Sequence, residues 1–257
     1  MNKALIIGFF VVSFVHLNAQ ESLDSSIKKL IISGNVGVTN NGISIIPTFS
    51  LNKPAFNATY SFSRGGRWSL DPDLRMTFDM RKGGVMFWLH YKMVNSGKFR
   101  LNVGAHPALN FAVRSVTENS KSWNITQSRR FIGTEIFPHY IVSDKLFFGV
   151  YYLKGFGLQK DGPVNSHFVA LNSTIAGIPL FGNVTLSLNP QVYYLKLDKE
   201  DGYYFSSNIT LSKPHSPFAF ASTMNKEIST NITGSKNFVW NLTLLYQFNK
   251  KYNSHSN

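Results

Sequence analysis

The feature that most constrains the fold of this chain is a long alternation of polar and apolar residues. In the stretch KFRLNVGAHPALNFAVR, residues 98–114, one parity is polar and the other apolar. A two-residue period is the signature of a β-strand, and an ordinary strand is only about 5–6 residues long. The pattern therefore predicts an unusually long strand with two chemically different faces. The polar parity holds Arg100, Asn102, His106, Asn110 and Arg114, and the apolar parity holds Phe99, Leu101, Val103, Leu109, Phe111 and Val113.

The same alternation recurs from about residue 31 to residue 249, with no helical period of any length. The predicted strands run roughly 9–15 residues, the length that a tilted strand needs to cross a bilayer. Turn residues separate them, as in Arg-Lys-Gly-Gly at 81–84 and Glu-Asp-Gly at 200–202. The sequence therefore predicts a single all-β domain built as a meander of hairpins.

A soluble β-sandwich also alternates, so the polar faces have to decide between the two architectures. The polar parities of residues 57–63 and 185–191 hold Asn, Thr, Ser and Gln but no Lys or Glu. Charged residues make up 15% of the chain, against about 25% in ordinary soluble domains. These features favour a transmembrane antiparallel up-and-down β-barrel over a soluble periplasmic or secreted β protein.

The first residues, MNKALIIGFFVVSFVHLNAQ, have the pattern of a secretory signal peptide. Lys3 precedes an apolar run, and cleavage is expected after Ala19. The apolar run is shorter than the roughly 20 residues of a spanning helix. We expect a signal peptide at 1–19 and an N-terminal lead-in at 20–30. The chain contains no cysteine, which excludes disulfides and thiolate metal sites.

The chain carries a formal charge of +13, of which only Lys3 belongs to the predicted signal. Nucleic acid is not expected as a partner, because the chain is exported and holds no dense run of Lys and Arg. A phosphate-rich lipid surface and small anionic solutes suit the predicted location better.

The long alternating strands and the closing segment FVWNLTLLYQF, Phe238 to Phe248, resemble the bacterial outer-membrane β-barrel proteins. The resemblance implies the cell outer membrane of a Gram-negative bacterium, with outer-membrane lipids and the barrel assembly machinery as partners. Trp240, Tyr246 and Phe248 match the aromatic-ending strand that such families use as an assembly signal. The barrel is expected over 31–249, followed by a C-terminal tail at 250–257.

Counting alternating segments gives thirteen, whereas bacterial single-chain barrels have an even number of strands. We therefore predict about 12 transmembrane β-strands, with the miscount in residues 31–63. Either 31–39 is a segment that does not span, or two short runs there, including 43–50, form one strand bent at Pro47 or Pro54. The longer gaps at 115–128, 158–163, 198–202 and 226–236 are expected outside the cell.

The candidate site is a ladder of charged side chains on the polar, lumen-facing parity. A hairpin closed on Lys82-Gly83 would pair Asp73 with Lys92 and Arg75 with His90. A three-residue loop at 95–97 would pair Lys92 with Arg100 and Met86 with His106. Two cations would then face one carboxylate, as a solvated patch or as a filter for anionic solutes. The ladder consists of Asp73, Arg75, His90, Lys92, Arg100 and His106.

Three kinds of function fit these features: a small porin-like passive pore biased toward anionic solutes, a structural or surface-interaction barrel with a blocked lumen, and an outer-membrane lipid hydrolase. The hydrolase would need a Ser–His pair drawn from His90, His106, His139 or His167. No local signature such as Gly-x-Ser-x-Gly selects one, so the sequence assigns no catalytic residue and favours a protein that is not an enzyme. No cofactor and no metal ion are expected.

Overall fold

The computed structural model describes residues 30–43, 46–160 and 162–252. The predicted signal peptide and nearly all of the lead-in lie outside the described residues. The described residues form no helix long and apolar enough to cross a membrane. The strands are β1 (Leu30–Thr39), β2 (Ala55–Ser63), β3 (Trp68–Thr77), β4 (Gly83–Ser96), β5 (Phe99–Glu118), β6 (Lys121–Ser143), β7 (Leu146–Gly157), β8 (Asn165–Pro179), β9 (Thr185–Leu197), β10 (Glu200–Ser212), β11 (Phe218–Thr230), β12 (Phe238–Trp240) and β13 (Thr243–Tyr252).

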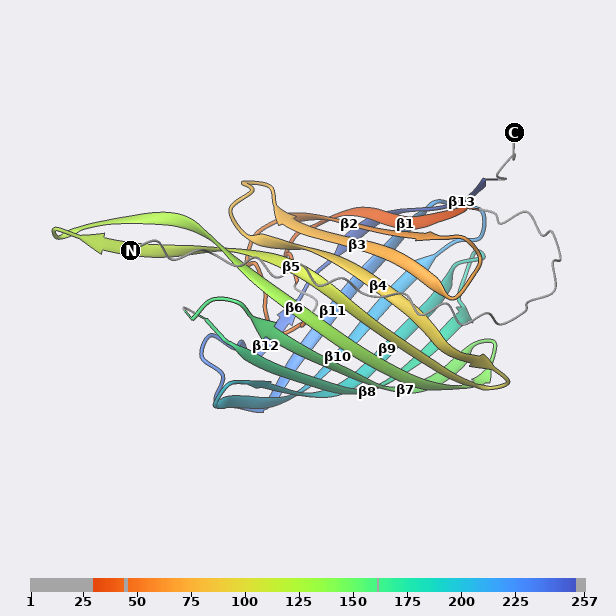
Figure 1. The fold of residues 1–257 in the computed structure, drawn as a ribbon. Coiled ribbons are helices and arrows are strands. Elements are labelled where there is room, and N and C mark those ends of the chain that lie inside the picture. The colour runs from red at the N-terminus through yellow and green to blue at the C-terminus, as the bar shows by residue number, and fades with distance from the viewer. Residues whose placement is uncertain (1–29, 44–45, 161, 253–257) are drawn as a thin grey trace, which may run out of the picture.

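The strands form one closed antiparallel barrel (Figure 1). Each strand from β1 to β11 pairs with the next one along the chain, and β13 closes the barrel by pairing with both β1 and β11. Closure leaves no long open sheet edge, which is the condition for a sheet to exist in hydrocarbon.

The barrel has twelve strands, as predicted, because β12 and β13 are two pieces of one strand. They pair with β11 in a single continuous register, Met224 opposite Trp240 and Ala221 opposite Thr243. The closing strand also runs past Phe248, since Asn249 to Tyr252 pair with the beginning of β1. It therefore ends three residues beyond the predicted barrel boundary at 249.

The error in the strand count lies in residues 43–50, and both explanations offered for it are wrong. Residues 31–39 do span, as β1, and pair along their whole length with β13 and β2. The described residues of 43–50, which are 43 and 46–50, belong to no strand, and an isolated bridge joins Ile43 to Ser50. Ile43 and Thr48 are both buried inside the barrel although they lie on opposite parities, so burial here does not follow the alternation of a strand.

The two ends of the barrel differ in their connections. Residues 64–67, 97–98, 144–145, 180–184 and 213–217 make short turns at one end, where Leu30 also pairs with Tyr252. The longer connections, which follow β1, β7 and β11, begin and end at the other end of the barrel. In barrels of this kind the longer loops face outward and the short turns face the periplasm.

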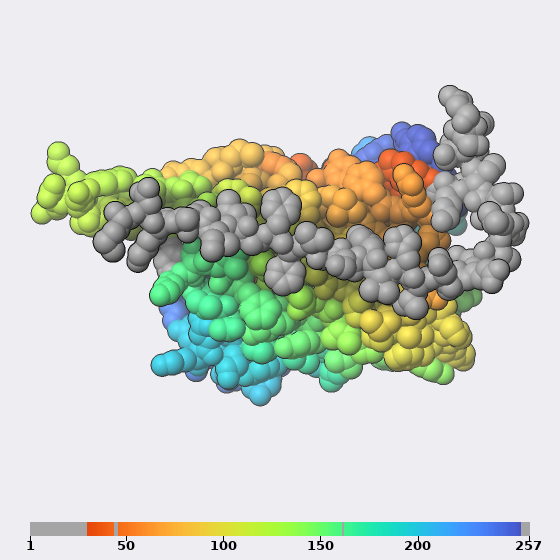
Figure 2. Space-filling model, viewed as in Figure 1, coloured from red at the N-terminus to blue at the C-terminus, as the bar shows by residue number. Residues whose placement is uncertain are grey.

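At the outer end, the hairpin of β5 and β6 extends beyond the rest of the barrel wall (Figures 1 and 2). Phe111 is the last residue of β5 that pairs with β4, and Phe131 is the first residue of β6 that pairs with β7. The strand pairs of the residues between them are therefore with each other. Asn119 and Ser120 close the hairpin with positive φ angles of 49° and 64°. The long outer loop expected at 115–128 is therefore largely strand.

The two faces of the wall have the chemistry that the alternation predicted. The outward face carries a belt of large apolar side chains, and the inward face buries polar ones such as Thr77, Ser206, Asn225 and Thr243. A closed barrel with an apolar outer belt is built to lie in lipid. Exposed members of the belt include Phe87, Leu89, Phe148, Val150, Leu171, Val192, Phe205, Phe220, Leu244 and Tyr246.

Candidate functional site in the barrel lumen

The six residues of the predicted ladder lie on the inward parity of β3, β4 and β5. Asp73 and His106 are buried, and Asp73, Arg75 and His90 line cavities in the lumen. Lys92 and Arg100 lie nearer the periplasmic end, where Arg100 donates to the carbonyl of Gly97 at 2.6 Å.

The pairings predicted for these residues are wrong. Asp73 lies opposite Met86 and Arg75 opposite Gly84, because Thr77 and Lys82 close the hairpin around a four-residue turn at 78–81. Lys92 lies opposite Asn102, His90 opposite Gly104 and Met86 opposite Ala108. A register shift between Lys92 and Val94 also displaces the rest of β4. There is consequently no row of Asp73, Lys92 and Arg100.

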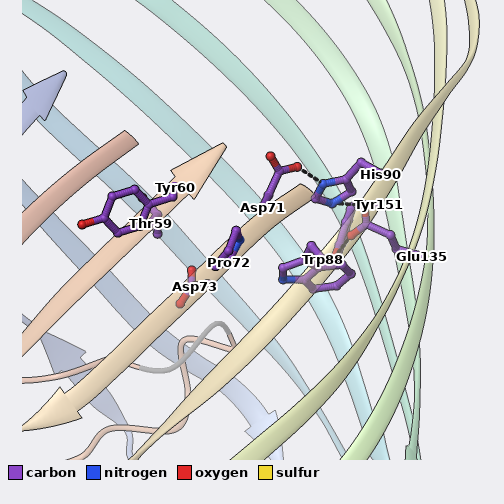
Figure 3. Close-up of a pocket in the computed structure, with 9 residues that line it drawn as sticks. All are labelled: Thr59, Tyr60, Asp71, Pro72, Asp73, Trp88, His90, Glu135 and Tyr151. Carbon is purple, nitrogen blue, oxygen red and sulfur yellow. Dashed lines mark hydrogen bonds and ion pairs between the residues drawn. The ribbon is translucent and has the colours of Figure 1, made fainter. Parts of the chain in front are cut away.

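His90 instead lies between two carboxylates (Figure 3). Its Nδ1 contacts Asp71, and its Nε2 lies 3.0 Å from Oε1 of Glu135. Only a protonated imidazole can donate from both ring nitrogens, so the arrangement suits a cationic His90. The hydroxyl of Tyr151 donates to the other oxygen of Glu135 at 2.5 Å. Four side chains from four strands are thus joined into one network across the wall.

Two glycines make room for the imidazole rings of His90 and His106. Gly104 of β5 lies between His90 and Glu135 in the register, and a Cβ there would come within 2.7 Å of the His90 ring. A Cβ on Gly133 would lie 2.1 Å from Nε2 of His106. Trp88 packs against both imidazoles, with ring centroids 5.3 Å from His90 and 3.9 Å from His106.

Asp71, Glu135 and Tyr151 are the site residues that the sequence reasoning missed. Their inward parity was readable from the sequence, and Glu135 lies on the inward parity of β6. Its partner, however, lies on β4, two strands away. The signal in the sequence was Gly104. Because this residue has no side chain, His90 and Glu135 on the two neighbouring strands can meet across it.

Arg75 forms a second ion pair within the wall and also donates a hydrogen bond to the loop that follows β1. Arg75 donates to both carboxylate oxygens of Asp73 at 2.9 Å each, and its Nη1 donates to the carbonyl of Ile43 at 3.2 Å. A bidentate pair of this kind fixes the plane of the guanidinium. Arg75 therefore holds one side of the loop against the lumen wall.

Two further contacts fasten this loop. The hydroxyls of Thr48 and Ser235 lie 3.1 Å apart, and Lys53 donates to Asp79 at 2.5 Å in the outer turns. The hydrogen bond from Lys53, with those from Thr77 and from the Arg81 amide, holds the pKa of Asp79 well below its ordinary value. Ile46 and Phe49 pack against a buried inward cluster that includes Phe168, Tyr193 and Tyr204. The loop thus narrows the outer half of the lumen.

Beside the loop lies a lumen cavity of about 460 Å³. Its wall is rich in amides and hydroxyls, and Arg75 is the charged side chain among its lining residues. Polar lining residues are Asn35, Thr39, Asn57, Thr59, Gln191, Asn208, Thr210, Thr223, Asn241 and Thr243. Such a surface offers many hydrogen bonds with little net charge.

Among the described residues, no serine hydroxyl bonds to a histidine, so no Ser–His pair is assembled.

The charges of the inner wall are distributed unevenly. The mid-lumen carboxylates Asp71, Asp73 and Glu135 all contact Arg75 or His90. Within the part of the chain that the structure describes, Lys92 and Arg100 form no ion pair. Among the described residues, the inner wall toward the periplasm therefore carries positive charge that no carboxylate contacts.

No family model matches the chain, and no curated protein sequence matches it. Among solved structures, the KdgM porin superposes with a TM-score of 0.51 at 11% identity, over 84% of this chain and 99% of that one. The KdgM porin in complex with disordered oligogalacturonate gives 0.50 at 10% identity, over 85% and 99%. OmpT of Vibrio cholerae in its trimer form gives only 0.42 at 10% identity, over 86% and 99%. At these identities the likeness is one of fold.

The closed barrel, its apolar outer belt and this likeness define the class: the chain is an outer-membrane β-barrel of a Gram-negative bacterium. Within that class it resembles small porins such as KdgM.

Proposed function

We propose that this barrel is a passive pore for small polar solutes with a preference for anions. The observation that supports the preference is the unneutralised pair Lys92 and Arg100 on the inner wall, beside carboxylates that are already paired. Low-dielectric walls focus the field of such charges and raise the local concentration of anions.

The cavity chemistry supports hydroxyl-rich solutes. Amide and hydroxyl side chains can exchange hydrogen bonds with a sugar, and the wall also exposes rings of Tyr151 and Phe168 to the cavity. The KdgM porin, which has the same fold, has been solved with oligogalacturonate, an anionic solute. For the present chain we propose, by extension, that the anionic solute is a short acidic saccharide.

Selectivity is tested by the zero-current potential across a planar bilayer under a salt gradient. The wild type is expected to favour anions, and Arg100→Glu should abolish or reverse the preference by replacing a lumen cation with an anion. The preference should weaken at high salt, because the screening length falls from about 8 Å at 0.15 M to about 3 Å at 1 M.

Lys121→Glu is the matched control, since Lys121 begins β6 at the tip of the projecting hairpin, far from the lumen. It makes the same change in net charge and should leave the potential nearly unchanged. A cation-selective wild type, or equal effects of the two substitutions, would refute the assignment of selectivity to the lumen.

The loop at 40–54 favours a second candidate, a barrel whose lumen is blocked and whose role is structural. Arg75, Ser235 and Asp79 all hold this loop, which occupies lumen space. A blocked barrel would insert into bilayers without producing current, so conductance distinguishes the two functions.

A further inference from the structure

The pentapeptide Val-Tyr-Tyr-Leu-Lys occurs twice in the chain, at 150–154 in β7 and at 192–196 in β9. In each copy the second and fourth residues face inward, where Leu153, Tyr193 and Leu195 are buried. The lumen packing explains those positions. It does not explain the lysines, which share the outward parity with the exposed Val150 and Val192.

The two copies lie at the same height on the outer surface, on either side of β8. Lys154 lies opposite His167, and His167 lies opposite Lys196. One residue pair below, Tyr152 and Tyr194 flank Val169 in the same way. The repeat therefore places three nitrogen-bearing side chains in one row across three adjacent strands.

The vertical order on this surface follows the layers of a membrane. From the middle of the barrel outward come Val150, Leu171 and Val192, which are 41%, 59% and 45% exposed, then the tyrosines, then the row of Lys154, His167 and Lys196. The row lies near the outer ends of its strands, at the loop end of the barrel. Apolar belt, aromatic girdle and basic row correspond to hydrocarbon, interface and headgroups.

The side chains in the row are oriented by neutral partners. Lys154 Nζ donates to Oδ1 of Asn165 at 3.1 Å, lies 3.0 Å from Nε2 of His167, and lies 4.8 Å above the ring of Phe156. The hydroxyl of Tyr152 lies 2.9 Å from the other ring nitrogen of His167. His167 is thereby fixed in the row, and Lys154 retains donor capacity.

The nearby carboxylates have other partners. Asp201, opposite Lys196, accepts from the hydroxyl of Tyr194 at 2.9 Å, and Asp198 accepts from the backbone amides of Val164 and Asn165 at 3.0 and 2.8 Å. Among the described residues, neither Lys154 nor Lys196 forms an ion pair. Lys154 interacts with Asp198 only at longer range, so within the described residues neither lysine of this lipid-facing patch has a carboxylate in direct contact.

The geometry points to a binding site for the phosphate group of a phosphorylated glycolipid in the outer leaflet, clamped between Lys154 and Lys196 with its acyl chains along Val150, Leu171 and Val192. The apolar stripe beneath the cations selects a lipid over free phosphate, because only a lipid covers both surfaces at once. The site is on the outside of the barrel and does not depend on whether the lumen conducts.

The test is a titration of the folded full-length barrel in mild detergent with diphosphoryl lipid A, followed by native mass spectrometry. Removing each lysine should weaken binding about fivefold, so that Lys154→Gln with Lys196→Gln weakens it roughly 25-fold. Lys199→Gln, an exposed lysine in the adjacent turn, is the matched control and should bind like the wild type. Heat-modifiable gel mobility verifies that each variant is folded.

Lys196→Gln alone gives a second measurement that does not depend on the Lys154 contacts, because Lys196 is exposed and makes no side-chain hydrogen bond or ion pair among the described residues. Dephosphorylated lipid A should bind at least fivefold more weakly than the diphosphoryl form. Wild-type affinity in the double variant, equal loss in Lys199→Gln, or equal binding of the dephosphorylated lipid would overturn the site. Displacement of the lipid by an equal concentration of inorganic phosphate would overturn its assignment to a lipid.

Discussion

In the middle of the barrel wall, His90 and Glu135 meet across Gly104, although a whole strand separates them. Parity along each strand was predictable, because the two-residue period fixes which side chains face the lumen. Register was not, because a slip of two residues preserves parity while changing every partner. The sequence therefore predicted which residues of the site face the lumen, but not which of them contact one another.

At the residue scale, Glu135→Gln should lower the free energy of unfolding by about 2 kcal/mol, because it removes a buried charged acceptor from both His90 and Tyr151. Reversible urea unfolding of the barrel in lipid vesicles measures the change. Tyr151→Phe should lower the free energy of unfolding by about half as much, since Glu135 still contacts His90 in that variant.

The double variant distinguishes a network from two separate contacts. Combined with Glu135→Gln, Tyr151→Phe should cost less than it does alone, because glutamine keeps one acceptor oxygen where the carboxylate offers two to Tyr151 and His90. Fully additive losses would show that the three groups do not act as one network.

At the element scale, residues 43–50 show why alternation alone misassigns a segment. A loop that packs inside a barrel can carry apolar residues in a strand-like pattern although its burial does not follow that pattern, since Ile43 and Thr48 are both buried on opposite parities. What separates the two is pairing with neighbours, which depends on segments far away in the sequence. The closing strand, by contrast, was predictable because its outward parity is almost entirely aromatic and leucine.

The loop can be locked in place, since the chain has no cysteine to interfere. In Thr48→Cys with Ser235→Cys, the two sulfurs would replace hydroxyls 3.1 Å apart and should form a disulfide on oxidation. If the loop is a fixed part of the pore wall, conductance should be the same oxidised and reduced.

Thr48→Cys alone, given the same oxidant, controls for effects of the thiol itself. A current that disappears in the oxidised double variant and returns with reductant would show instead that the loop must leave the lumen for solutes to pass.

At the scale of the whole molecule, the even-strand rule gave the right number of strands despite one misassigned segment, because closure constrains the count independently of local pattern. The same closure explains how a chain without disulfides can be expected to survive export: nearly every backbone group of the wall is paired within a continuous ladder. Whether the interior conducts depends on how side chains and the loop fill it, and no pattern along the chain encodes that.

The single-channel conductance of the refolded wild-type barrel in a planar bilayer tests the proposed pore most directly. Folded protein, verified by its faster gel mobility before boiling, should produce discrete current steps whose size increases with salt concentration. Verified insertion of folded barrels without current steps would contradict the pore and support the barrel with a blocked lumen.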